Sequence, residues 1–248
     1  MREFAPTFHT SGLISAALDE RGFVVLSRGW TMQACGVDRA ALDDFATSWN
    51  ELPPDPYLKD GGHYRLRRHS SFVVDSGLCR PVSHRPHFQS SNYNALHGGM
   101  ERWFEPMSDE LAGHPAFQRL IVSLGELCSE VSGARPWFVE AHQFRIDTHE
   151  GIGRPTPEGA HRDGVDFVAV FFVGRAGIKG GETRVFQAAA PNGVRFTLTE
   201  PWSLLFLDDA RVVHESTPIQ PAEQDDSPAR GHRDTLVLTF RRDGFQRP

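Results

Sequence analysis

The sequence predicts a mainly β protein with helices packed on the outside of the β structure. After residue 133, short apolar runs recur with turn signals such as GIKGGE and APNG between them. These runs do not alternate with helical segments of about 10–15 residues, which disfavours a parallel βαβ sheet. The 17 prolines and 23 glycines supply the turns that many short strands need. An antiparallel sandwich or barrel is therefore expected.

The first elements are expected to be a helix, a strand and a second helix. Ser11 is expected to cap a helix that runs to Glu20, and Gly22 to end it. FVVL at 23–26 follows as a strand. Another helix is predicted from about Asp38, because apolar residues recur there at helical spacing. These residues are Leu42, Phe45, Ala46 and Trp49.

The clearest helix is predicted over Pro115–Ser132, where Gly133 fits the position that ends it. Its apolar residues form one stripe: Phe117, Leu120, Ile121, Leu124, Leu127, Cys128 and Val131. Between this helix and the preceding one lies LPPDPYLKDGGHYRLRRHSSF, rich in turn residues and then in cations. Its end is expected to be extended, with two alternating faces. One face would carry Tyr64, Leu66 and Arg68, and the other Arg65, Arg67 and His69.

Six β-like runs follow Gly133. They cover 137–146, 167–173, 183–187, 194–199, 203–207 and 235–241. No sequence repeat or low-complexity segment breaks the pattern. A single domain over 1–248 is expected, with helical support up to about residue 134 and a β core over about 135–242.

Composition excludes several classes of function. A net charge of -6 and a pI near 6.0 argue against non-specific nucleic-acid binding. Three distant cysteines without C-x-x-C spacing disfavour a disulfide framework and an all-cysteine metal site. The N-terminal MREFAPTFHT lacks the apolar stretch of a signal peptide, and no window approaches the ~20 apolar residues of a membrane span. A reducing, cytoplasmic setting is predicted.

One short motif carries metal chemistry. In EGAHRDGVDF, His161 and Asp163 are two positions apart, so on an extended chain they project to the same side. The best third ligand is His214 in DDARVVHEST, just after the strand SLLFL and across the sheet. Two imidazoles and one carboxylate form the facial triad of non-haem Fe(II) oxygenases. Three coordination positions then stay open for a 2-oxoacid and dioxygen.

The sequence disfavours other interpretations of the motif. A kinase loop would need asparagine five residues after the aspartate, where Val168 stands, and GIGRPT has only two glycines of a dinucleotide loop. Twelve histidines make chance H-x-D pairs common. The surrounding β-rich run, the GGE turn at 180–182 and a downstream arginine favour the metal. A zinc hydrolase with the same ligands would lack a clear general base.

The downstream arginine is expected to bind a carboxylate. In GHRDTLVLTF, Arg233 and Thr235 alternate onto one strand face, where a guanidinium fork and a hydroxyl can bind one carboxylate group together. Arg230 is the rival, because the turn-rich PAEQDDSPA brings either arginine within reach of His214.

Several stretches together resemble the Fe(II)/2-oxoglutarate-dependent dioxygenases, in particular a small bacterial branch that includes free L-amino-acid hydroxylases such as the isoleucine dioxygenase. They are DPYLKDGGHYRLRRHSSF, SSNYNALHGGMERWFEP, HQFRI, PTPEGAHRDGVDFVAVFFVGRAGIKGGET, LDDARVVHESTPIQP and GHRDTLVLTFR, within roughly residues 55–242. The resemblance implies a double-stranded β-helix, the jelly roll also called cupin-like. It further implies that helices pack on one side of this β-helix.

The resemblance also implies a chemistry. His161, Asp163 and His214 would hold Fe(II), while Arg233, assisted by Thr235, would bind the distal carboxylate of 2-oxoglutarate. The co-substrate would be decarboxylated to succinate and CO2 while O2 hydroxylates a C–H bond. His232 stands where relatives are expected to have tyrosine, which would change the cavity lining.

The expected partner is a small molecule, most simply a free amino acid, with no nucleic acid and no membrane; a homodimer is left open. A non-catalytic sensor of 2-oxoglutarate or an amino acid on the same fold is the alternative. Gln143 and Arg145 share one strand face and are expected to line the cavity beside the iron as cofactor-binding residues. Candidate substrate ligands are Glu158 and Asp166 for an ammonium group, Arg65, Arg67 and Arg68 for a carboxylate, and Asn92 and Tyr93 from the family pattern.

Overall fold

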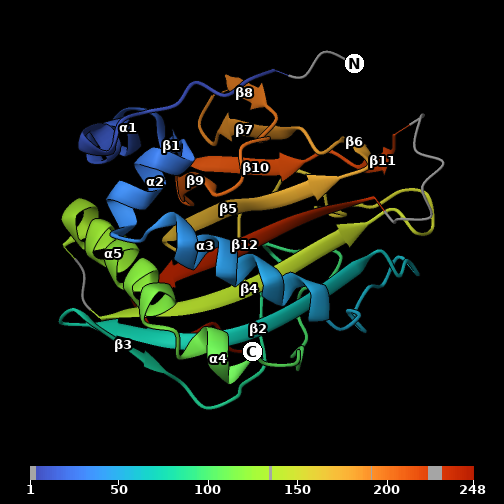
Figure 1. The fold of residues 1–248 in the computed structure, drawn as a ribbon, viewed down its shortest axis with the longest axis horizontal. Coiled ribbons are helices and arrows are strands. Elements are labelled where there is room, and N and C mark those ends of the chain that lie inside the picture. Colours follow the sequence, from blue (N-terminus) through green and yellow to red (C-terminus); the bar gives the residue numbers. More distant parts are fainter. Residues whose placement is uncertain (1–3, 134–135, 191, 223–230) are drawn as a thin grey trace.

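The protein is built on two facing β-sheets with helices on one side (Figure 1). The computed structural model describes residues 4–133, 136–190, 192–222 and 231–248. The large antiparallel sheet has the order β1-β9-β5-β12-β4-β2-β3. Its strands are β1 Phe23–Leu26, β9 Ser203–Asp208, β5 Phe167–Ala176, β12 His232–Arg241, β4 Trp137–Asp147, β2 Arg65–Asp75 and β3 Leu78–Pro81.

A smaller sheet faces one end of the large sheet. It consists of β10 Val212–Ser216, β7 Thr183–Gln187 and β8 Gly193–Phe196, and a separate pair joins β11 Ile219–Pro221 to β6 Ile178–Gly180. Apolar side chains from both layers form one cluster, in which Val185 and Val212 of the smaller sheet join Val168 and Leu205 of the large sheet. The two layers form the jelly roll that was expected.

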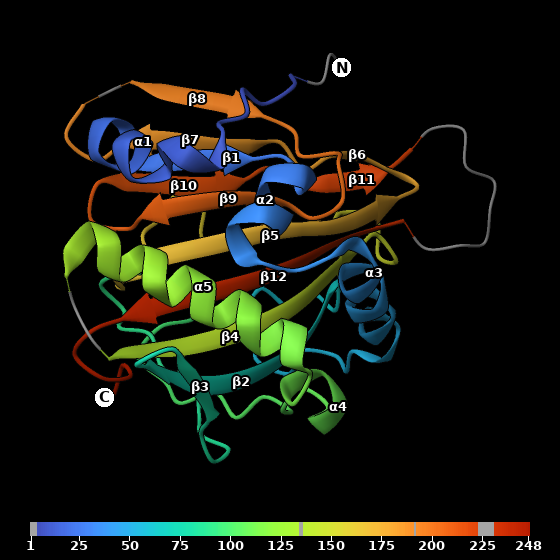
Figure 2. The ribbon, with the colours of Figure 1, turned by 60° about the vertical axis from the view of Figure 1, so that its left-hand side comes forward.

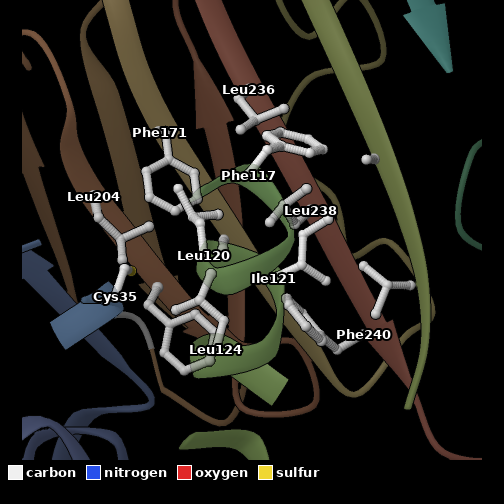
Figure 3. Packing of buried hydrophobic residues seen from close by; sticks show 14 of the residues in the cluster. Cys35, Phe117, Leu120, Ile121, Leu124, Phe171, Leu204, Leu236, Leu238 and Phe240 are labelled. Carbon is white, nitrogen blue, oxygen red and sulfur yellow. The ribbon is translucent and has the colours of Figure 1, made fainter. Parts of the chain in front are cut away.

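Helices cover the outer face of the large sheet (Figure 2). They are α1 Ile14–Arg21, α2 Arg28–Cys35, α3 Arg39–Thr47, α4 Asp109–Ala112 and α5 Pro115–Ser132, with 3-10 turns at Ser11–Leu13 and Ser48–Glu51. The apolar stripe of α5 packs against β5, β9 and β12, where Phe117, Leu120 and Ile121 lie close to Leu236 and Leu238 (Figure 3). Among the described residues, no helix is long and apolar enough to cross a membrane.

Helices α3 and α5 follow the sequence prediction closely, whereas α4 was not predicted. α5 has the predicted bounds, and Gly133 ends it with a φ of 68°, which an L side chain rarely adopts. The Asp38 carboxylate caps α3 by accepting a hydrogen bond from the Ala41 N–H at 2.9 Å. The predicted cap at Ser11 is wrong: a 3-10 turn intervenes, so α1 begins at Ile14 after Leu13. Helix α2, capped by Ser27, was not predicted.

All six predicted strands after Gly133 are present, but the predicted division near residue 134 does not bound the β structure. Strands β1, β2 and β3 precede it and belong to the large sheet, where β2 pairs with β4 along ten positions from Arg65 to Val74. Long-range antiparallel pairing therefore joins the two parts. The short strands β3, β6, β10 and β11 were not predicted, because three to five residues carry too little alternation.

Candidate active site

A cavity opens between the sheets, and strand register sets its floor. Arg65 of β2 and Arg233 of β12 lie on either side of Ile146 of β4, in one row across three strands. The next row on the same face joins Arg67, Phe144 and Thr235 in the same order. All of these residues line the cavity. The predicted alternation of β2 is confirmed, because Arg65, Arg67 and His69 share one face; this face is buried.

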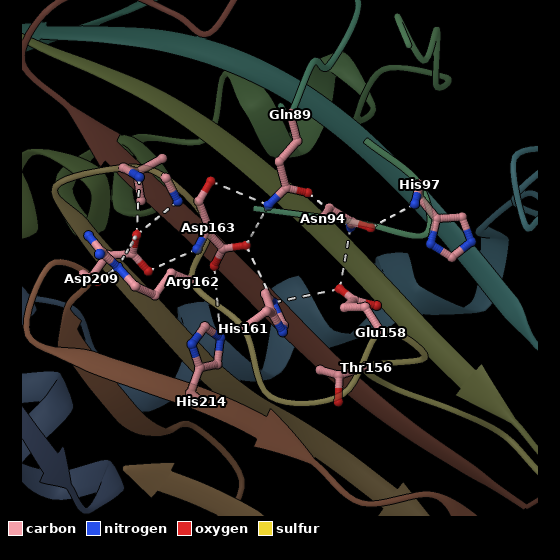
Figure 4. A network of polar contacts seen from close by, with 12 residues as sticks. Gln89, Asn94, His97, Thr156, Glu158, His161, Arg162, Asp163, Asp209 and His214 are labelled. Carbon is pink, nitrogen blue, oxygen red and sulfur yellow. Dashed lines mark hydrogen bonds and ion pairs between the residues drawn. The ribbon is translucent and has the colours of Figure 1, made fainter. Parts of the chain in front are cut away.

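His161, Asp163 and His214 converge at the wall of this cavity (Figure 4). Each offers one ligand atom, and the three atoms lie within 4.8 Å of one another. His161 Nε2 is 3.6 Å from Asp163 Oδ1, and His214 Nε2 is 3.8 Å from Asp163 Oδ2. His214 lies inside β10 of the smaller sheet, and reciprocal backbone hydrogen bonds of 3.0 and 3.1 Å join it to His161. The three side chains therefore come from two segments that pair locally.

A backbone hydrogen bond orients the His161 ring towards Asp163. Its Nδ1–H donates to the Gly159 carbonyl oxygen at 2.9 Å, so Nε2 faces Asp163. Burial lowers the pKa of His161, but the hydrogen bond and charge of Asp163 raise it overall to about 10. A divalent cation at the same place would replace the proton that Asp163 attracts. These residues therefore fit a single ferrous ion, with two nitrogen ligands and one oxygen ligand.

A buried carboxylate, Asp209, fixes the loop that carries Asp163. Its oxygens accept hydrogen bonds from the backbone N–H groups of Asp163, Gly164 and Val165 at 2.9, 2.8 and 3.2 Å. Burial raises the pKa of Asp209 to about 6, and the negative charge of Asp163 adds to this shift. Gln89 Nε2 donates to Asp163 Oδ1 at 3.2 Å. Neither supporting residue was predicted, because nothing in the local sequence marks them.

Arg233 and Thr235 both line the cavity from β12, as their alternation predicted. Arg233 is 4% exposed, and burial, then the charge of Arg175, lowers its pKa to about 10, so it stays a cation at neutral pH. Its rival Arg230 lies outside the described residues. Among the described arginines of the segment, Arg233 is therefore the one that reaches the cavity from β12.

Two predicted cofactor-binding residues lie on the wrong face of β4. Gln143 donates to the Ser48 hydroxyl at 2.8 Å, and Arg145 forms a two-point ion pair with Asp234 at 2.7 and 2.8 Å. Both contacts are on the helix side of the sheet, whereas the cavity side carries Phe144. Because β4 is buried on both faces, polarity alone could not tell which alternating set faces the cavity.

Most predicted substrate residues also lie elsewhere. Asp166 pairs with Arg242 at 2.7 Å, and Arg68 pairs with Glu105 at 3.2 Å, so each satisfies an ordinary surface charge. Asn92 is exposed, and Tyr93, at 38% exposure, packs beside Gly164 and does not line the cavity. Of these candidates, Glu158 lines the cavity. Arg65 and Arg67, which were also expected to bind a carboxylate, line it as well.

Several further lining residues were not predicted as site residues, although some lie in stretches that carry the family resemblance. They include His87, Gln89, Asn94 and Arg102 between β3 and α4, Glu140 and His142 on β4, and Gln246 near the C-terminal end. Asn94 links two of them, because its amide donates to Gln89 Oε1 at 3.0 Å and to Glu158 Oε1 at 3.4 Å. The nearest sequence signal was SSNYN, of which the last residue, the buried Asn94, lines the cavity.

A jelly roll with a two-histidine, one-carboxylate set and an arginine deep in the same cavity defines the mononuclear iron and 2-oxoacid class of enzyme. A model of the 2OG-Fe dioxygenase family matches residues 46–239. The chain belongs to this family and is a 2-oxoglutarate-dependent dioxygenase that uses Fe(II), 2-oxoglutarate and O2.

Solved structures agree. A bsmA homologue from Methylobium petroleophilum is 51% identical, with a TM-score of 0.92 over 100% of this chain and 99% of that one. IDO from Bacillus thuringiensis is 20% identical, with a TM-score of 0.74 over 93% and 98% of the two chains. The Fe(II)/α-ketoglutarate-dependent dioxygenase TqaL is 21% identical, with a TM-score of 0.70 over 94% and 87%. The last two are alike in fold alone. No curated protein matches the chain.

Proposed function

We propose that this dioxygenase hydroxylates a free L-amino acid, with release of succinate and CO2. The observation that carries the metal assignment is the convergence of three ligand atoms within 4.8 Å, with His161 Nδ1 already engaged by a carbonyl. His161, Asp163 and His214 would hold Fe(II), which when bound supplies the activation of O2 for attack on a C–H bond.

Arg233 and Thr235 would bind the distal carboxylate of 2-oxoglutarate. The guanidinium can donate two parallel hydrogen bonds, and the hydroxyl can add a third. Both side chains are buried, at 4% and 5% exposure, so the charge-assisted bonds would form away from competing water. The row of Arg67, Phe144 and Thr235 would then lie beside the co-substrate.

An amino-acid substrate is supported by paired polar and apolar features of the cavity. Glu158 lies 3.6 Å from His161 Nε2 through Oε1, while its buried Oε2 has no partner among the described residues and can accept from an ammonium group. Arginines line the same cavity and can bind a carboxylate, and Phe144, Ile146 and Val237 add apolar lining. The protein would position one C–H bond and exclude bulk water.

Anaerobic reconstitution with Fe(II), followed by 2-oxoglutarate and O2 over a panel of free amino acids, tests the proposal. Succinate formed only with certain amino acids, with one added oxygen in the product, supports it. Asp163→Ala should abolish both products, and Arg233→Met should raise the 2-oxoglutarate requirement at least tenfold while iron still binds. Succinate formation that survives Asp163→Ala would reject the assigned iron site.

A cytoplasmic location and a homodimer complete the proposal. All three cysteines are free, and Cys35 and Cys128 are buried, which suits a reducing compartment. Fractionation of the expressing cell tests the location, and light scattering on purified protein tests the homodimer.

A further inference from the structure

Three arginines gather at the part of the cavity formed by β2 and the segment before α4. Arg65, Arg67 and Arg102 are 6%, 3% and 2% exposed, and all three line the cavity. Arg65 Nε donates to Asp55 Oδ2 at 2.7 Å, and Arg67 Nη1 lies 3.7 Å from the same oxygen. One buried carboxylate therefore faces two of the three guanidinium groups.

Several of their hydrogen-bond donors have no acceptor. Arg65 Nη2, Arg67 Nε, and both Nε and Nη2 of Arg102 are buried without a partner among the described residues. Arg102 has no ion pair within 4 Å in that part of the chain, and its guanidinium lies 5.9 Å from the centre of the Phe104 ring. Burial, then the charge of Arg65, lowers the pKa of Arg102 only to about 10, so it remains charged near neutral pH. An unpaired buried guanidinium is strongly unfavourable unless a ligand neutralises it.

The charges around the cavity do not balance. The described lining residues and their direct ion-pair partners include five arginines, at positions 65, 67, 85, 102 and 233. Against them stand four carboxylates, of Asp55, Glu140, Glu158 and Asp163. Fe(II) and doubly charged 2-oxoglutarate would cancel one another, so one positive charge is left. A zwitterionic amino acid would not remove this charge.

We infer that Arg102, with Arg65 and Arg67, forms a second carboxylate subsite and that the substrate carries a net negative charge. The simplest such substrate is an amino acid with an acidic side chain, whose ammonium group would face Glu158. This inference rests on the proposed function, since it names the substrate class of the same cavity. It assigns Arg102 to the substrate and Arg233 to 2-oxoglutarate.

Calorimetric binding tests the inference on the anaerobic Fe(II) enzyme with saturating 2-oxoglutarate. The probes are two near-isosteric pairs, L-glutamate with L-glutamine and L-aspartate with L-asparagine. At least one acid should bind ten times more tightly than its amide. Arg102→Met should weaken that acid about 10- to 100-fold, as expected for loss of charge-assisted hydrogen bonds, and Arg102→Lys should weaken it less. The affinity for 2-oxoglutarate should stay within twofold in both variants.

Arg233→Met is the matched control, because glutamate resembles the co-substrate. It should weaken 2-oxoglutarate and leave acid binding at a saturating concentration of 2-oxoglutarate unchanged. Urea unfolding checks the fold of Arg102→Met, whose stability should not fall, because methionine removes an unneutralised charge. A loss of stability that accompanies unchanged acid binding would show that Arg102 is structural and overturn the inference.

Other outcomes also overturn the subsite. They are equal or tighter binding of the amides, no binding of either acid, or acid binding that depends on Arg233 alone. Hydroxylation of a neutral amino acid that is indifferent to Arg102→Met would likewise reject this inference while leaving the proposed function intact. Failure of the wild-type protein to bind Fe(II) and 2-oxoglutarate would instead reject the proposed function.

Discussion

Two histidine and carboxylate clusters border the same cavity, yet their surroundings give them different chemistry. The first contains His161, Asp163 and His214. The second contains His69, His87, Glu140 and His142. In each cluster the candidate ligand atoms lie within 4.8 Å of one another, so composition and spacing alone would accept both as metal sites.

Hydrogen bonds from arginines distinguish the second cluster. Arg67 Nη2 donates to His142 Nδ1 at 2.7 Å, which leaves the hydrogen of the neutral ring on Nε2 and no free lone pair there. Glu140 Oε1 accepts from Arg85 at 2.7 Å, and its two oxygens lie 3.2 and 3.3 Å from His69 and His87. The carboxylate and the tautomer are therefore committed to internal hydrogen bonds.

The pKa shifts of the histidines do not separate the two clusters by themselves. Asp163 raises the pKa of His161 to about 10, which reflects a strong local preference for positive charge. Burial lowers the pKa of His87 to about 4, although Glu140 opposes the shift. Burial lowers the pKa of His214 in the first cluster to about 4 as well, so the arginine hydrogen bonds, and not the pKa shifts, distinguish the second cluster. What surrounds a set of ligands decides whether it holds a metal.

The largest expected difference is in metal binding. His161→Ala should weaken Fe(II) binding at least 100-fold, because it removes one of three ligands. His87→Asn, the matched variant of the second cluster, should change it less than threefold. Anaerobic titration calorimetry measures both. Comparable losses in the two variants would mean that the second cluster also holds iron.

Replacing the carboxylate of each cluster should change the stability of the folded protein by different amounts. Glu140→Gln removes a buried acceptor of Arg85 and should lower the free energy of unfolding by about 3–5 kcal/mol. Asp163→Asn in the metal-free protein should lower it by less, about 1–3 kcal/mol, because relief of the repulsion with Asp209 offsets part of the lost ion pair with His161. Urea unfolding of both variants without metal provides the comparison. A more damaging Asp163→Asn would contradict the assigned roles.

Acid should destabilise the protein through the second cluster. The pKa of His87 is lowered from 6.5 to about 4 in the folded protein. Between these two pH values, the unfolded chain therefore binds a proton that the folded protein does not bind. The stabilising contribution is complete above pH 6.5 and is lost as the pH falls towards 4, by about 1–3 kcal/mol. Unfolding curves at pH 7, 6 and 5 should therefore show a steeper fall for wild type than for His87→Asn. An equal fall of stability with pH in the two proteins would show that the proton binds at a residue other than His87.

The sequence was most informative where motif and spacing limit the chemistry that a set of residues can perform. His161, Asp163, His214 and Arg233 were placed at one cavity by spacing and motif, and the structure brings them together there. The stripe of α5 was equally clear, because eighteen helical residues give a long periodic signal.

Prediction failed where both faces of a strand are buried, because the sequence pattern then does not show which alternating set of residues faces the cavity. Gln143 and Arg145 alternate correctly with Phe144, but only the pairing of β4 with β2 and β12 shows which set faces the cavity. Arg102 and Asp209 were missed for a related reason. Their roles depend on contacts with residues far along the chain, such as His87 and Asp163, that no local pattern records.

The smallest expected effect comes from the support of Asp163. Asp209→Asn keeps the size of the side chain, but its amide group cannot accept the hydrogen bonds that the second carboxylate oxygen receives from Gly164 and Val165. The loop should then hold Asp163 less firmly, and Fe(II) affinity should fall about tenfold, as for other residues that orient a ligand. Anaerobic calorimetry measures the change. Asp208→Asn serves as the control, because the Asp208 carboxylate accepts a hydrogen bond from the Ala210 N–H and, among the described residues, from none of the Asp163 loop; it should change Fe(II) affinity less than twofold. If both variants bind Fe(II) like wild type, the Asp163 loop is rigid without Asp209, and the first cluster owes its geometry to the pairing of His161 with His214 alone.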